Sequence, residues 1–83
     1  MNDYIINNAH FLKRARNIRN ELLNKTYKFI LSDYPISLEQ QMKIKLYREE
    51  LRNHINNNEI KILAGEKVDF PPQPNFINLN IIY

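Results

Sequence analysis

The sequence predicts a mainly α protein: an antiparallel helical hairpin followed by an irregular, proline-rich extended C-terminal arm with possible short β-strands. Apolar residues recur at helical spacing in two segments, which predicts two helices. Only residues 32–36 link the segments, and so short a link favours antiparallel neighbours. Three of the four prolines fall within residues 70–74, where they fix φ and remove amide donors. We therefore expect a helical hairpin over residues 1–58, followed over residues 59–83 by a possible short β-hairpin and an extended arm.

The first helix is predicted over residues 9–31. Its apolar side chains recur at intervals of three, four and seven, as on a helix that faces a core or a partner. Pro35 ends the helical region because a residue before proline avoids helical backbone angles. The stripe comprises Phe11, Ala15, Ile18, Leu22 and Phe29, widened by Leu12, Leu23 and Ile30.

The second helix is predicted from Ser37 to about residue 56. Ser37 and Gln40 have the spacing of a capping box, in which each side chain binds the other residue's backbone amide. Ile44, Tyr47, Leu51 and Ile55 then form one apolar stripe.

Beyond Asn58 the apolar period changes from helical to alternating. Residues 60–62 and 68–70 are predicted as two short strands around a turn at residues 64–66. Residues 77–83 alternate in the same way but have no mate left in the chain. A strand without a mate is a candidate for pairing with another protein.

Size and composition narrow the functional classes. A chain of 83 residues buries about 60–65% of its unfolded surface, so a partner is the expected support. The absence of cysteine excludes disulfides and a thiolate nucleophile. His10 and His54 are too few for a metal cage, so no metal or cofactor is expected. His54 lies near the predicted end of the second helix, where a favourable interaction with the helix dipole is sufficient to explain it. No apolar run approaches the roughly 20 residues of a membrane span, and the N-terminus lacks signal-peptide character, so use without export is expected.

No enzyme is predicted. The carboxylates that could act as acid or base have no nucleophile paired with them in the sequence, and the single glycine excludes a glycine-rich phosphate loop. These carboxylates are Asp33, Glu39, Glu49 and Glu50.

From Arg19 to Ile55 a set of residues keeps a particular order and spacing, and a Val-x-aromatic-Pro element follows. The set is Arg19, Leu22-Leu23, Thr26, Leu31, Asp33, Pro35-Ile36-Ser37, Glu39-Gln40, Tyr47-Arg48 and Leu51-Arg52, then Val68-Asp69-Phe70-Pro71 and Pro74. Over about two thirds of the chain this resembles the phage tail assembly chaperone family. Three positions depart from that family's usual residues. After the threonine, where the family has Asp-Trp, this chain has Tyr27-Lys28. The family's two tryptophans, one in the helix and one near the end, are replaced by Ile44 and Phe70.

The resemblance implies a bacteriophage tail-associated structural adaptor or tail (fibre) assembly factor, located in the virion tail or in the host cytoplasm during assembly. Its partners would be other tail, tail-fibre or baseplate proteins, with a homo-oligomer as a further option. No small-molecule substrate and no membrane partner is expected.

The predicted partner-binding residues fall into two groups. Arg48 and Arg52, four residues apart on one helix face, would dock an acidic patch; the alternative is that they are solvated while Tyr47 and Leu51 fill the seam between the helices. The arm over residues 70–83 would lie on a partner; the alternative is that it folds back on the hairpin. Its candidate residues are Phe70, Pro71, Pro74, Phe76, Ile77, Leu79, Ile81 and Tyr83.

The second functional class is a small basic nucleic-acid-binding regulator. The net charge is +3, and Lys13, Arg14, Arg16 and Arg19 form a basic stretch on the first helix. No aromatic residues interleave there for base stacking, so a solvated face is the preferred interpretation and nucleic acid is an unlikely partner. With four to six phosphate contacts, the logarithm of the binding constant for duplex DNA would fall with the logarithm of the salt concentration with a slope of roughly −4 to −5. This salt dependence would distinguish a nucleic-acid-binding regulator from a tail-associated protein.

Overall fold

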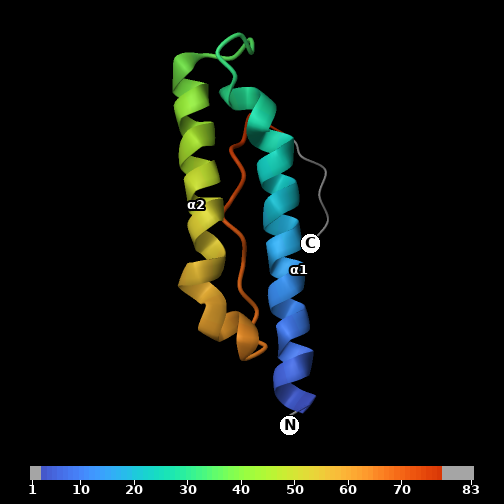
Figure 1. Cartoon of the computed structure of the whole chain (residues 1–83). Coiled ribbons are helices and arrows are strands. Elements are labelled where there is room, and N and C mark those ends of the chain that lie inside the picture. The colour runs from blue at the N-terminus through green and yellow to red at the C-terminus, as the bar shows by residue number, and fades with distance from the viewer. Residues whose placement is uncertain (1–2, 78–83) are drawn as a thin grey trace.

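Two long helices lie side by side and antiparallel in a computed structural model that describes residues 3–77, with side chains from residue 9 (Figure 1). Helix α1 spans Asp3–Thr26, a 3₁₀ helix η1 spans Tyr27–Ile30, and α2 spans Leu38–Leu63. The molecule is elongated, with principal extents of 52 × 19 × 18 Å. The predicted helical hairpin is thus confirmed. Neither helix is long and apolar enough to cross a membrane.

The first helix begins earlier than predicted and ends in a tighter turn. It starts at Asp3, and residues 27–30 form η1 where the helix was expected to continue as α. The Thr26 hydroxyl donates to the Leu22 carbonyl at 2.7 Å and to the Leu23 carbonyl at 3.2 Å. Such back-bonding competes with the backbone ladder, and a 3₁₀ turn is a common way to end a helix.

The predicted capping box at the start of α2 is confirmed. Ser37 Oγ accepts a hydrogen bond from the Gln40 amide, and Gln40 Oε1 accepts one from the Ser37 amide, each at 3.1 Å. Two amides that the helix itself leaves without partners are satisfied in this way.

Replacing Ser37 with alanine should lower the free energy of unfolding by about 1 kcal/mol, because the Gln40 amide loses its acceptor. Urea denaturation followed by circular dichroism measures the change. Ser32→Ala, at an exposed serine of the preceding loop, is the matched control and should change stability by less than about 0.5 kcal/mol. Equal stability of the Ser37→Ala variant and the parent would contradict the cap.

Helix α2 continues seven residues beyond its predicted end, so the strand predicted at residues 60–62 is wrong. Ile62 follows Ile55 by seven residues and is buried on the same face, whereas Ile60 is 84% exposed. The alternation of Ile60 and Ile62 therefore reflects one buried and one outward position of a helix.

The predicted hairpin turn at residues 64–66 is instead the C-terminal cap of α2. The Gly65 amide donates to the Ile62 carbonyl, and the Glu66 amide to the Lys61 carbonyl, each at 3.0 Å. Gly65 has a φ of +79°, as this Schellman cap requires. The strand predicted at residues 68–70 is not present either, and residues 3–77 contain no strand.

Residues 66–77, which we call the return segment, run back between the two helices (Figure 1). Phe70 and Ile77 pack against a buried cluster of Leu22, Tyr47 and Leu51. Val68 packs against a second cluster, formed by Leu12, Ile55 and Ile62. The described part of the predicted arm therefore folds back on the hairpin, as the alternative interpretation proposed. The predicted seam residues Leu22, Tyr47 and Leu51 lie in the core.

Candidate functional site: an apolar groove beside α1

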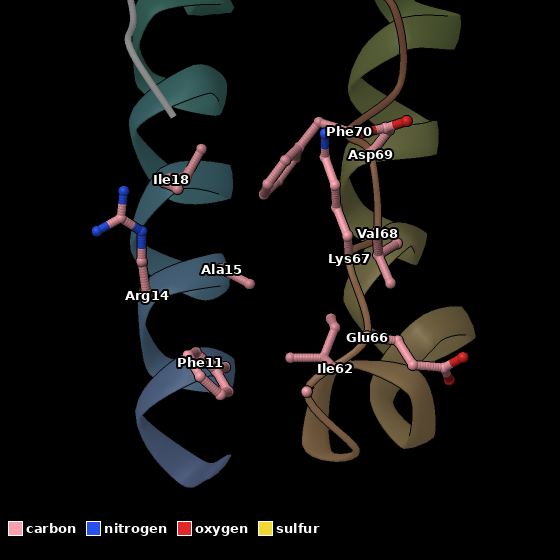
Figure 2. A pocket seen from close by; sticks show the side chains of 11 residues that line it. Phe11, Arg14, Ala15, Ile18, Ile62, Glu66, Lys67, Val68, Asp69 and Phe70 are labelled. Carbon is pink, nitrogen blue, oxygen red and sulfur yellow. The ribbon is translucent and has the colours of Figure 1, made fainter. Parts of the chain in front are cut away.

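An open groove of about 370 Å³ lies between α1 on one side and the last turn of α2 with the return segment on the other (Figure 2). Phe11 and Ile18 on α1 face Ile62 and Phe70 across it. Phe11 is 51% exposed, so the groove is open to solvent at that side chain. The apolar lining residues are Phe11, Ala15, Ile18, Ile62, Val68 and Phe70.

The two walls have different origins. Phe11, Ala15 and Ile18 are spaced by four and three residues, so α1 presents them on one face. The opposite wall exists because the Gly65 cap ends α2 and turns the chain back. A Cβ atom added to Gly65 would lie 3.9 Å from the Phe11 ring, so the cap itself closes one end of the groove.

The charged residues that line the groove are all exposed to solvent. Arg14 lies on the α1 side, and Glu66, Lys67 and Asp69 lie on the return segment. Figure 2 shows the Glu66 and Asp69 carboxylates directed away from α1. The buried and half-buried residues of the lining are therefore all apolar, and such a lining is suited to aliphatic or aromatic groups of a ligand.

The described residues do not form a metal site. Over those residues, no group of three or more histidine, cysteine, aspartate or glutamate side chains is placed to hold a metal ion. The groove is lined instead by apolar side chains, so what the arrangement can do is bind apolar groups.

The two predicted docking arginines have different environments. The Arg48 guanidinium donates to the Leu23 carbonyl and, at 2.8 Å, to Thr26 Oγ1, at the C-terminal end of α1. It also lies 5.9 Å from the Tyr27 ring centre. Burial, with a smaller contribution from the nearby Arg52 charge, lowers the pKa of Arg48. Arg48 thus ties α2 to the end of α1, whereas Arg52 is exposed.

Several residues that carry the family resemblance meet at this junction of the two helices. Leu22, Tyr47 and Leu51 form the buried cluster there, and Thr26 is completely buried beneath Arg48. Sequence reasoning missed the contact between Thr26 and Arg48, because no local spacing relates residues on two different helices. In this structure these residues hold the hairpin together.

The remaining predicted docking residues of the return segment are half-buried. Pro74 borders a cavity of about 250 Å³ with Tyr47 of α2, and Pro71 lies beside His54 at another cavity of about 430 Å³. Phe76 and Ile77 are half-buried as well, and Ile77 contacts the core. Leu79, Ile81 and Tyr83 lie outside the described residues.

His54 is not at the end of α2, as predicted, because the helix continues to Leu63. His54 is 7% exposed, and its imidazole stacks on the Phe70 ring, with 4.6 Å between ring centres. Asn58 Nδ2 donates to the His54 carbonyl at 2.8 Å and lies 3.5 Å from His54 Nδ1. Burial lowers the pKa of His54. A contact with the return segment, and not the helix dipole, therefore explains this histidine.

Acidification should destabilise the fold through His54. In the unfolded chain the imidazole has its ordinary pKa of about 6.5, and burial lowers that pKa in the folded chain. The unfolded state then binds the proton first, so stability is full above about pH 6.5 and falls as the pH drops towards the folded pKa. We expect a lower thermal midpoint at pH 5 than at pH 7.5. His54→Gln should show a smaller drop, since carboxylate titration is common to both proteins; an equal drop would exclude His54 as the source.

The predicted basic stretch is spread along α1. Lys13, Arg14 and Arg16 are exposed, and Arg14 borders the groove. Arg19 is half-buried and donates from Nε and Nη2 to Asn20 Oδ1, at 3.1 and 3.0 Å. Three of these four side chains are therefore solvated.

Comparison of the chain with protein-family models, curated proteins and solved structures finds no match. What this chain binds must therefore be inferred from its own surfaces, the groove among them. One such surface escaped the sequence prediction: Leu38, Met42 and Leu46 on α2 are all more than half exposed. Their spacing of four residues, on the side of α2 away from the core stripe, is the signal that could have revealed them.

Proposed function

We propose that this chain is a bacteriophage tail-associated adaptor or tail (fibre) assembly factor that binds another tail, tail-fibre or baseplate protein. The observation that carries protein binding is the groove between α1 and the return segment, whose interior is apolar while its outer edge stays open. The phage context is supported by the resemblance of residues 19–55 to the phage tail assembly chaperone family. The role would be exercised in the virion tail or in the host cytoplasm during assembly.

Binding would work by burial of apolar side chains of the partner between Phe11, Ile18 and Phe70. Each large apolar side chain removed from water contributes about 1.5–3 kcal/mol before the costs of association. Because the α1 side of the groove is a regular helix, little conformational entropy of its backbone should be lost on binding. Arg14 at the rim favours a carboxylate next to the inserted side chains.

The test measures binding of the purified chain to individually purified tail, tail-fibre and baseplate proteins from the same phage. Phe11→Asp places a charge in the groove at a side chain that is already half exposed, so the fold should survive. We expect binding to weaken at least tenfold, whereas Tyr27→Asp, at a similarly exposed aromatic residue outside the groove, should bind like the parent. Circular dichroism of both variants checks the fold.

Two results would contradict the proposal. If none of the tail proteins binds, or if both variants bind like the parent, the groove is not the docking site. Duplex-DNA binding with a salt slope of roughly −4 to −5 would instead favour the nucleic-acid alternative. Mass spectrometry of purified particles then distinguishes an adaptor, present in stoichiometric amount, from an assembly factor that is absent.

A further inference from the structure

Helix α2 carries a second apolar stripe that the hairpin leaves uncovered. Leu38, Met42 and Leu46 are 73%, 58% and 59% exposed. An α-helix turns through about 100° per residue, so these three lie on one side of α2, and Met42 is diametrically opposite Leu51. Since Leu51 is completely buried against α1, the stripe points away from the hairpin. Leu46, at one end of the stripe, also borders Pro71, Pro72 and Pro74 of the return segment, but most of its surface stays exposed.

The region around this stripe is a shallow apolar surface. Ile30 of η1 joins Met42 and Leu46 in lining a depression of about 490 Å³. Ile30 is half-buried, so the end of the first helical segment extends the surface beyond α2. Charged residues of both signs border the stripe: Glu39 and Lys43 lie on one edge, and Lys45 lies on the other. The depression itself is also lined by Arg48, Glu49 and Arg52. Because the border carries both positive and negative side chains, it can pair with a partner surface that carries charges of both signs as well.

We propose that the stripe is the contact surface for a second copy of this chain, with the two α2 helices antiparallel and a twofold axis at Met42. Met42 then packs on Met42 of the other copy, and Leu38 packs on its Leu46, so that every apolar residue of the stripe meets another. The contact is isologous and closes on itself, as in most homodimers.

The edge charges support this register. Glu39 and Lys43 lie on the same side of the stripe, and reversal of the second helix about Met42 brings Glu39 opposite Lys43 of the other copy. Within one chain these side chains form a 3.6 Å ion pair and remain 81% and 58% exposed, so both can also reach across. The register therefore adds two symmetric pairs of opposite charge to the three apolar layers.

The size of the stripe sets the strength of the contact. Three side chains per copy cover less than the roughly 800 Å² per partner of a standard interface, so the dimer should be weak and reversible. This inference does not depend on the groove: the stripe lies on the first half of α2 and on η1, and the groove is lined by α1, the last turn of α2 and the return segment. The groove and the depression at the stripe share no lining residue.

The first test is sedimentation equilibrium of the full chain between about 10 µM and about 1 mM, the range in which a weak dimer forms. The parent should change reversibly from monomer to dimer. Met42→Lys should weaken the dimer at least tenfold, whereas Ile60→Lys, at an 84% exposed isoleucine of the same helix, should not. A parent that remains monomeric throughout, or an equal loss in both variants, would overturn the proposal.

The second test addresses the register through charge reversal. Glu39→Lys alone and Lys43→Glu alone should each weaken self-association, because like charges then meet across the axis. A mixture of the two variants should associate more tightly than either one, since both cross pairs become attractive. Glu66→Lys mixed with Lys67→Glu carries the same net charges away from the stripe and should show no such gain. If that control pair gains as much, or the first mixture gains nothing, this register is wrong.

Discussion

Replacing Leu51 with alanine should lower the free energy of unfolding by about 2–4 kcal/mol, the largest effect that we expect from one side chain in this protein. Leu51 has no exposed surface and packs in the cluster with Leu22 and Tyr47, beneath Phe70 and Ile77. Its truncation loses the burial of the side chain and leaves a cavity where both helices and the return segment meet. Because small domains are stable by only about 5–15 kcal/mol, the variant should lose a large part of its stability.

Chemical denaturation followed by circular dichroism at low protein concentration measures this loss. Leu46→Ala is the matched control, because it removes the same atoms from an outward position of the same helix that is 59% exposed. It should cost less than about 0.5 kcal/mol. Leu22→Ala should behave like Leu51→Ala, since Leu22 is equally buried from the other helix. Similar losses for Leu46→Ala and Leu51→Ala would mean that the two faces of α2 are misassigned.

Replacing Phe70 with alanine should cost about 2–3 kcal/mol, somewhat less than the 3–5 kcal/mol typical of a fully buried phenylalanine, because Phe70 is half-buried. The ring stacks on His54 and packs against the cluster of Leu22, Tyr47 and Leu51. Loss of the ring exposes His54 and the buried cluster to solvent and weakens the packing of the return segment against the helices. A docking arm that stood apart from the core would instead give unchanged stability.

Phe11→Ala is the control for Phe70, since Phe11 borders the same groove but is 51% exposed. It should cost less than about 1 kcal/mol. Deletion of residues 75–83 gives a second measurement: because Ile77 packs on the core, the truncated chain should melt below the parent. If the deletion and Phe70→Ala both leave the thermal midpoint unchanged, the return segment contributes nothing to the fold.

The hairpin and its start signals could be predicted from the sequence because they depend on local physics. A helical stripe and a capping box are decided by residues three or four apart, and the structure confirms both at Ser37 and at the buried Leu22 and Leu51. The end of α2 was missed because a short apolar alternation fits a strand as well as a helix. The spacing of Ile60 and Ile62 fits a strand, whereas in the structure the helix continues past both residues to the glycine cap at Gly65.

By itself, then, the sequence determined two antiparallel helices, their seam and the cap of the second helix. Tertiary structure alone decided that Phe70 returns to stack on His54, that Arg48 reaches Thr26, and that Phe11 and Ile18 form a groove with Ile62 and Phe70. These contacts join segments far apart in the chain. They arise because uncovered apolar surface on one element is buried by whichever other element the fold brings beside it, and no local spacing in the sequence records that choice.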